Sequence, residues 1–178
     1  MKVQLSELKK RIAEAKKQIL ANMPRIVEEY AHTARVISER NIIEKGFGED
    51  YSTNEVPAFF FLGKELNATG KSFVKKKIKE KEGLNWSAFK EAQGLPTDHV
   101  TLSYTNEMWR GVGVLKVEVK GNTFIAILGH NNKAGKDKMG WNRERYGDFI
   151  MKSLSKEDRK FLIELANDEV MAIIKRIL

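Results

Sequence analysis

Residues 112–128, VGVLKVEVKGNTFIAIL, decide the fold class of this chain. The valines of residues 112–119 alternate with other side chains, and the alternation slips once, which predicts two strand segments joined by a bulge. Gly121-Asn122 is a hairpin turn signal. A second apolar stretch, residues 123–128, follows and is ended by a glycine. Together these features predict an antiparallel hairpin.

Helical periodicity dominates both ends of the chain. In the N-terminal part, the apolar residues at helical spacing are Leu5, Leu8, Ile12, Ala15, Ile19 and Leu20. The pattern resumes after Pro24 and stops near Asn41, which predicts either two helices or one helix kinked at the proline. Near the other end, Ser155 and Asp158 have the spacing of a capping box, so we expect a C-terminal helix to begin there.

The expected fold class is therefore α+β, with a long N-terminal helical region, a small antiparallel sheet with a hairpin, and a C-terminal helix. The length of 178 residues suits a single structural domain. Within it we expect an N-terminal helical arm over about 1–41 and an α+β core over about 98–178.

Three shorter stretches of the second half carry local signals. Val100, Leu102 and Tyr104 alternate with polar residues, which predicts a strand. Residues 106–111 are typical of a short helical turn, and the polar, glycine-bearing residues 130–140 are typical of a flexible loop.

The large aromatic residues are expected to anchor packing. This applies to Trp86, Trp109 and Trp141, and Trp109 in particular should be buried beside the hairpin. The apolar run Phe59-Phe60-Phe61-Leu62 predicts either a buried strand or a contact with another protein.

Composition narrows the class of protein. The chain has no cysteine, which excludes disulfides and thiolate metal sites. Its first residues lack an apolar signal core, and no apolar run reaches the roughly 18 residues of a membrane span, so we expect a soluble chain. The net charge of +8 fits a nucleic acid, an anionic surface or an acidic protein as partner, without choosing among them.

Candidate catalytic motifs are incomplete. Gly70-Lys71-Ser72 matches the end of a phosphate-binding loop, but Glu65 stands where that loop needs its first glycine. His99, next to Asp98, and His130 suggest a metal nuclease, which would require several ligands to converge. Scattered, hydrogen-bonded histidines are the more economical interpretation, so we expect no enzyme, no cofactor and no metal.

The order of motifs across residues 98–158 resembles Mu-type virion morphogenesis proteins and related phage tail completion proteins. DHVTLSYTNEMW (98–109) is similar to their strand that runs into a methionine-bearing turn, and the hairpin follows. Residues 145–150 match their arginine and aromatic stretch, and 154–158 match their Leu-Ser-x-x-Asp helix start. Asn106 stands where the family has a glycine, and asparagine also tolerates a left-handed backbone.

The resemblance implies a structural virion protein that forms a homo-oligomeric ring at the head–tail junction. It would be made in the bacterial host cytoplasm, contact portal or adaptor and tail proteins, and surround the DNA channel without a membrane partner. The expected interface residues are Ile26, Val27, Tyr30, Ile37, Phe59, Phe60 and Phe61. The expected contacts with DNA or an acidic partner are Lys75, Lys76, Lys77, Lys79 and Lys81. The alternatives are a basic nucleic-acid-binding protein and a nuclease using His99 and His130.

Overall fold

The computed structural model describes residues 5–102 and 107–177. The chain divides into two compact units: unit 1 comprises residues 1–40 and 107–178, and unit 2 comprises residues 41–106. The expected α+β class is confirmed, with a long N-terminal helix, small antiparallel sheets that include a hairpin, and a C-terminal helix. The single domain with an arm over 1–41 and a core over 98–178 stays a prediction.

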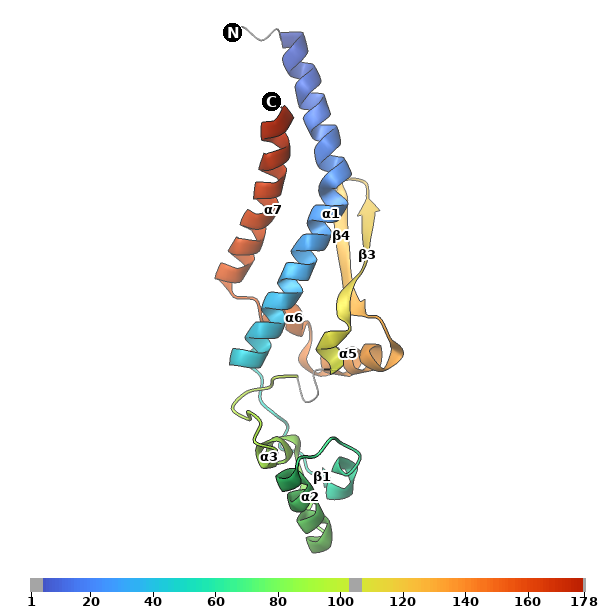
Figure 1. Ribbon diagram of the computed structural model, residues 1–178, viewed down its shortest axis with the longest axis vertical. Helices are drawn as coiled ribbons and strands as arrows, with labels where there is room; N and C mark the ends of the chain where they lie inside the picture. The colour runs from blue at the N-terminus through green and yellow to red at the C-terminus, as the bar shows by residue number, and fades with distance from the viewer. Residues whose placement is uncertain (1–4, 103–106, 178) are drawn as a thin grey trace. The chain divides into compact units, whose positions relative to one another are not determined.

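One helix, α1 (Leu5–Lys45), forms the N-terminal region (Figure 1). Of the two arrangements that the sequence left open, the single helix is the one observed, and it ends at Lys45 rather than near Asn41. Pro24 lies inside it and removes one backbone hydrogen bond, a local cost of about 3 kcal/mol that burial of the following apolar side offsets. Gly46, at φ 70°, ends the helix in the left-handed conformation.

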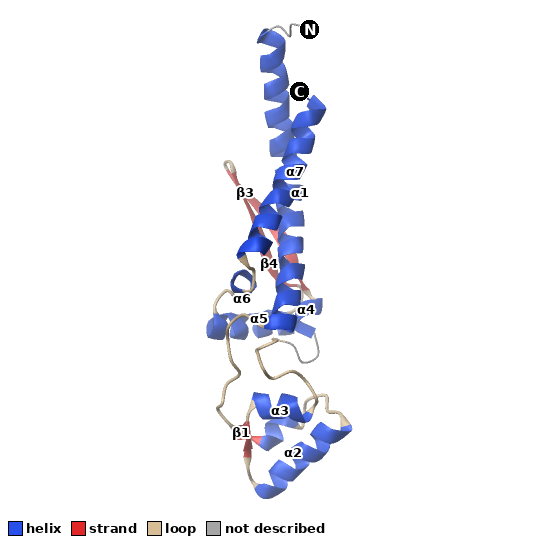
Figure 2. Cartoon of the chain, turned by 90° about the vertical axis from the view of Figure 1, so that its left-hand side faces the viewer, coloured by secondary structure: helices blue, strands red, loops and turns tan. Residues whose placement is uncertain are grey.

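The C-terminal helix, α7 (Lys156–Ile177), begins at the predicted capping box. The backbone N of Asp158 donates to Ser155 Oγ at 3.0 Å, and the backbone N of Ser155 donates to Asp158 Oδ2 at 2.9 Å. Figures 1 and 2 show α7 lying alongside α1. Between them, Ala34, Leu154 and Leu162 form a buried cluster of unit 1.

The predicted hairpin is confirmed as β3 (Val112–Lys120) paired antiparallel with β4 (Thr123–His130). The register shifts between Val114 and Lys116, where the slip in alternation predicted a bulge. Gly121 has φ 62°, which the tight turn requires and glycine adopts without strain. The predicted helical turn is present before the hairpin as α4 (Glu107–Arg110).

The expected flexible loop over 130–140 is wrong. Residues 133 onward form α5 (Lys133–Tyr146), and α6 (Phe149–Lys152) follows. The side chain of Asn132 accepts a hydrogen bond from the backbone N of Gly135 at 2.9 Å, which caps α5. The helix is largely polar, so apolar periodicity did not reveal it, and the asparagine cap was the available signal.

The tryptophans differ in burial. Trp109 is fully buried, as predicted, and its ring meets that of Phe149 edge to face at 5.9 Å between centroids. Trp86 is partly exposed and packs edge to face on Phe89. The packing role expected of Trp141 is wrong, because 66% of its surface is exposed on α5.

Unit 2 is built from short elements. In chain order they are β1 (Val56–Pro57), the 3-10 helix η1 (Ala58–Phe61), α2 (Ala68–Glu80), β2 (Gly83–Leu84) and α3 (Trp86–Ala92). β1 pairs antiparallel with β2. The core consists of Ala58, Phe61, Val74, Leu84 and Phe89. Phe59, Phe60 and Phe61 thus lie in η1 and Leu62 caps its C-terminal end, so this run is not the buried strand that was one of its two interpretations.

The strand expected from Val100 is absent from residues 100–102, and residues 103–106 lie outside the described part of the chain. Val100 and Thr101 are both buried, so the alternation of apolar and polar residues does not correspond here to alternating sides of a strand. The backbone N of Val100 donates to the carbonyl of Glu49 at 3.3 Å, and Leu102 adopts φ 48°. The segment is thus held as an irregular connection.

Candidate interaction surfaces

The residues predicted as an oligomer contact on α1 occupy different environments. Ile26 is buried within unit 1, and Tyr30 and Ile37 pack against its buried cluster of Ala34, Leu154 and Leu162. Val27 is half-buried. Ile26, Tyr30 and Ile37 therefore contribute to the chain's own core, which leaves them little surface for a partner.

The three phenylalanines of η1 separate into a core residue and an exposed pair. Phe61 is buried against Phe89, with ring centroids 4.5 Å apart. Phe59 and Phe60 stack on each other at 4.7 Å and remain 57% and 60% exposed. We call Phe59 and Phe60 the phenylalanine pair. Because two stacked, exposed rings form a contiguous apolar patch, this pair is a candidate contact surface.

A third apolar surface lies at the start of α1. Leu5, Leu8 and Ile12 are 68%, 41% and 52% exposed, at spacings that place them on one side of the helix. We call these three residues the α1 stripe. The same side continues into Ala15, which is buried in unit 1. Figure 1 shows these first turns of α1 running past the C-terminal end of α7. The sequence pattern marked these residues as apolar, but it did not indicate which of them would stay uncovered.

The five predicted lysines lie on α2 or at its C-terminal end, and their environments differ. Lys77 pairs with Glu82 and also lies over the ring of Phe73, 5.7 Å from its centroid. The hydrogen bond between Lys77 and Glu82 raises the pKa of the lysine and lowers the pKa of the carboxyl. Lys76 lies 3.9 Å from Glu80.

The other predicted lysines of this segment have different positions. Lys75 and Lys79 are exposed on α2, and Lys81 ends the helix at φ 57°. Lys71, which was not predicted, is exposed one turn before Lys75. Lys71 was not predicted as a contact residue because Gly70-Lys71-Ser72 was interpreted only as a nucleotide-binding motif.

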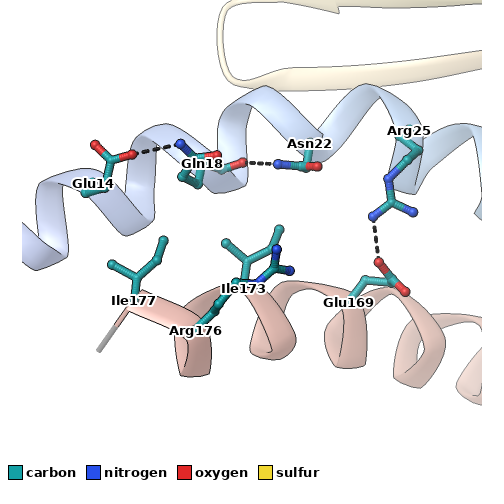
Figure 3. Close-up of a pocket in the computed structure, with 8 residues that line it drawn as sticks. All are labelled: Glu14, Gln18, Asn22, Arg25, Glu169, Ile173, Arg176 and Ile177. Atoms are coloured by element: carbon teal, nitrogen blue, oxygen red, sulfur yellow. Dashed lines mark hydrogen bonds and ion pairs between the residues drawn. The ribbon is translucent and has the colours of Figure 1, made fainter.

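A groove of about 240 Å³ lies between α1 and α7 (Figure 3). Its walls carry Glu14, Gln18, Asn22 and Arg25 from α1 and Glu169, Ile173, Arg176 and Ile177 from α7. An ion pair of 2.6 Å between Arg25 and Glu169 spans it, and the hydrogen bond to Glu169 raises the pKa of the arginine. The groove is small for an organic ligand, and its lining is mainly polar groups that bond one another. We therefore interpret it as part of the contact between the two helices and not as a binding pocket.

The histidines considered for a nuclease belong to separate units. In unit 2, His99 Nδ1 lies 3.0 Å from Asp98 Oδ2, and this hydrogen bond lowers the pKa of Asp98. In unit 1, His130 is buried, and its Nδ1 accepts from the backbone N of Asn132 at 3.1 Å. A Cβ at Gly135 would lie 2.1 Å from the His130 ring, so the imidazole is packed against backbone.

The described residues contain no grouping of three or more His, Cys, Asp or Glu side chains able to hold a metal ion. Over residues 5–102 and 107–177, no helix is both long and apolar enough to cross a membrane.

A buried lysine in unit 2 was not predicted. Lys90, 3% exposed on α3, donates to Tyr51 Oη at 2.6 Å and to Thr101 Oγ1 at 2.7 Å. Its ammonium also lies 5.0 Å from the centroid of the Tyr51 ring. The contact joins α3 to two irregular segments that are distant in sequence. Lys90 therefore connects these segments within unit 2.

Replacing Lys90 with alanine is expected to lower the free energy of unfolding by about 1–3 kcal/mol, because it removes a buried charged donor and leaves two hydroxyls partly unsatisfied. Urea denaturation followed by circular dichroism measures the loss. The control is Lys75→Ala, an exposed lysine of the same unit, which should change stability by less than about 0.5 kcal/mol. Equal stability of the two variants would show that the Lys90 contacts contribute nothing.

Comparison with known proteins finds no matching family model, no matching curated protein and no matching solved structure.

Proposed function

We propose that this chain is a non-enzymatic structural protein of a tailed-bacteriophage virion that forms a closed homo-oligomeric ring at the head–tail junction. The ring would link the portal or an adaptor to the tail around the DNA channel. The observation that carries the proposal is the apolar surface left uncovered by the chain itself, namely the α1 stripe and the phenylalanine pair. The similarity of motif order across residues 98–158 to tail completion proteins supports the same function.

The α1 stripe supports assembly because its exposure has a free-energy cost. Leu5, Leu8 and Ile12 together expose one continuous apolar side of a helix, where single scattered apolar residues would need no explanation. Burying a leucine or isoleucine side chain fully contributes about 1.5–3 kcal/mol. A ring gains this energy once at every interface, so burial of the α1 stripe between neighbours favours assembly.

The phenylalanine pair supports a second, different contact. Phe59 and Phe60 lie in unit 2, whereas the α1 stripe lies in unit 1, so the chain presents two distinct apolar surfaces. Neighbours in a cyclic ring meet through unlike surfaces, each protomer using one surface on each side. Such an interface requires two distinct apolar surfaces on each chain, whereas a two-fold dimer needs only one self-complementary surface.

A second candidate is a basic nucleic-acid-binding protein that works alone. The net charge of +8 supports it, since a positive excess attracts a phosphate backbone at long range. This candidate leaves the α1 stripe and the phenylalanine pair without a use, so we favour the ring.

The ring predicts a defined loss of assembly in the variant Leu8→Gln with Ile12→Gln. We expect the parent chain to sediment as a closed oligomer and to appear in the neck of purified particles by electron microscopy. The double variant should sediment as a monomer with an unchanged far-ultraviolet circular dichroism spectrum, because both side chains are already exposed in the single chain.

The matched control is Lys10→Gln with Lys17→Gln, which changes two exposed residues on the opposite side of the same helical segment. This control should assemble like the parent. If the parent chain stays monomeric and is missing from particles, the ring proposal is contradicted and the nucleic-acid-binding candidate is favoured.

A further inference from the structure

The exposed surface of α2 is rich in lysine. Lys71, Lys75 and Lys79 follow one another at intervals of four residues, which places them in a row along the helix. Gly70 and Val74, each next to a lysine of this row in the sequence, are buried in unit 2. The three lysines themselves are exposed to solvent on this helix of 13 residues. We call Lys71, Lys75 and Lys79 the lysine row.

The charge of the lysine row is not neutralised within the described part of the chain. No hydrogen bond or ion pair to another described residue involves these three ammonium groups, whereas the neighbouring Lys77 is paired with Glu82. Unit 2 contains nine lysines and nine acidic residues. Five of these lysines lie in α2, but only one of the acidic residues, Glu80, does. The unit is thus neutral as a whole and strongly polarised, with its positive charge gathered on one helix.

The other exposed residues of this side are small or hydroxylic. Thr69 and Ser72 flank the start of the lysine row, and no aromatic or large aliphatic side chain interrupts it. Interfaces between proteins are depleted of lysine and depend on apolar or aromatic anchors. Contacts to phosphate use lysine, serine and threonine side chains. The composition of this side therefore favours a phosphate backbone over an acidic protein.

The spacing of the lysine row also suits a phosphate backbone. Four residues of α-helix rise about 6 Å, so the three lysines extend over about 12 Å. Phosphates of one DNA strand succeed each other every 3.4 Å or so along the duplex axis, and flexible lysine stems can each reach a separate one.

We propose that the lysine row binds the sugar–phosphate backbone of duplex DNA without sequence preference. This inference deepens the proposed ring, on which it rests for the source of the DNA, by assigning the residues that contact the duplex in its channel. It replaces the broader set of five lysines, since Lys77 is paired with Glu82, Lys76 lies 3.9 Å from Glu80, and Lys81 ends the helix.

The test measures how the affinity of the full-length chain for a short labelled DNA duplex of arbitrary sequence depends on salt. In the variant Lys71→Gln, Lys75→Gln, Lys79→Gln, the slope of log affinity against log salt should fall by about 2.7 per bound protomer, since each neutralised phosphate contributes about 0.9. Between about 50 and 200 mM salt, the parent should then lose about 40-fold more affinity than the variant.

The matched control is Lys156→Gln, Lys160→Gln, Lys175→Gln, which removes the same charge from exposed positions of α7. This control should keep the slope of the parent. An equal fall in both variants would show that net charge alone acts, and an unchanged slope in the α2 variant would overturn the contact. Binding of polyglutamate but not of the duplex would assign the lysine row to an acidic protein and also overturn it.

Sedimentation of the same samples separates this inference from the proposed ring. A variant that assembles like the parent but has lost the slope supports both statements. A monomeric parent whose slope depends on the lysine row supports the DNA contact and rejects the ring. A ring whose duplex affinity ignores the lysine row rejects the contact and leaves the ring standing.

Discussion

Replacing Trp109 with alanine is expected to lower the free energy of unfolding by about 3–5 kcal/mol. The indole is fully buried in unit 1, and its ring meets Phe149 edge to face. The backbone carbonyl of Trp109 also accepts a hydrogen bond from Arg35, so the segment before the hairpin is attached to α1. Truncation leaves a large cavity that these fixed neighbours cannot fill.

Urea denaturation followed by circular dichroism measures the effect of the Trp109 substitution. The control is Trp141→Ala, the same truncation at a side chain that is 66% exposed, and it should cost less than about 0.5 kcal/mol. Similar losses in the two variants would contradict the assignment of Trp109 to the core.

Replacing Phe89 with alanine should have a comparable effect on unit 2, again about 3–5 kcal/mol. Phe89 is fully buried, and its ring lies 4.5 Å from that of Phe61 and 5.4 Å from that of Trp86. Aromatic pairs of this kind contribute about 0.5–1.5 kcal/mol beyond the area they bury. The core of unit 2 is small, so loss of its central ring removes a large share of its packing.

Hydrogen exchange of the amides in residues 68–92 measures this loss within unit 2. The matched control is Phe60→Ala, since Phe60 is largely exposed and the same atoms are removed. It should leave exchange unchanged and weaken ring assembly, because Phe60 belongs to the phenylalanine pair. Faster exchange in the Phe60 variant than in the Phe89 variant would reverse the assignment of core and surface.

The sequence predicted the candidate interaction surfaces only in part. Four of the five lysines of α2 were predicted from their density in the sequence, and Lys71 was not. The pairing of Lys77 was not predicted either, because Glu82 reaches Lys77 only once the helix has ended at Lys81. The run of phenylalanines was identified, whereas its division into a buried Phe61 and an exposed pair depends on α3 packing on one side of η1.

Local signals determined the elements whose stabilising contacts are close in sequence. Valine alternation and a glycine turn specified the hairpin, because its two strands are joined directly by the turn. The reciprocal bonds of Ser155 and Asp158 specified the start of α7, because the two residues are three positions apart.

The tertiary structure alone decided what depends on partners far along the chain. Lys90 is buried because Tyr51 and Thr101, 39 and 11 residues away, supply acceptors for its ammonium. The continuity of α1 through Pro24 and the irregular backbone at Val100 have the same origin, since packing outweighed local propensity at both places. Burial is a property of assembled neighbours, so the periodicity of a segment shows which side is apolar, and only the fold decides whether that side is covered.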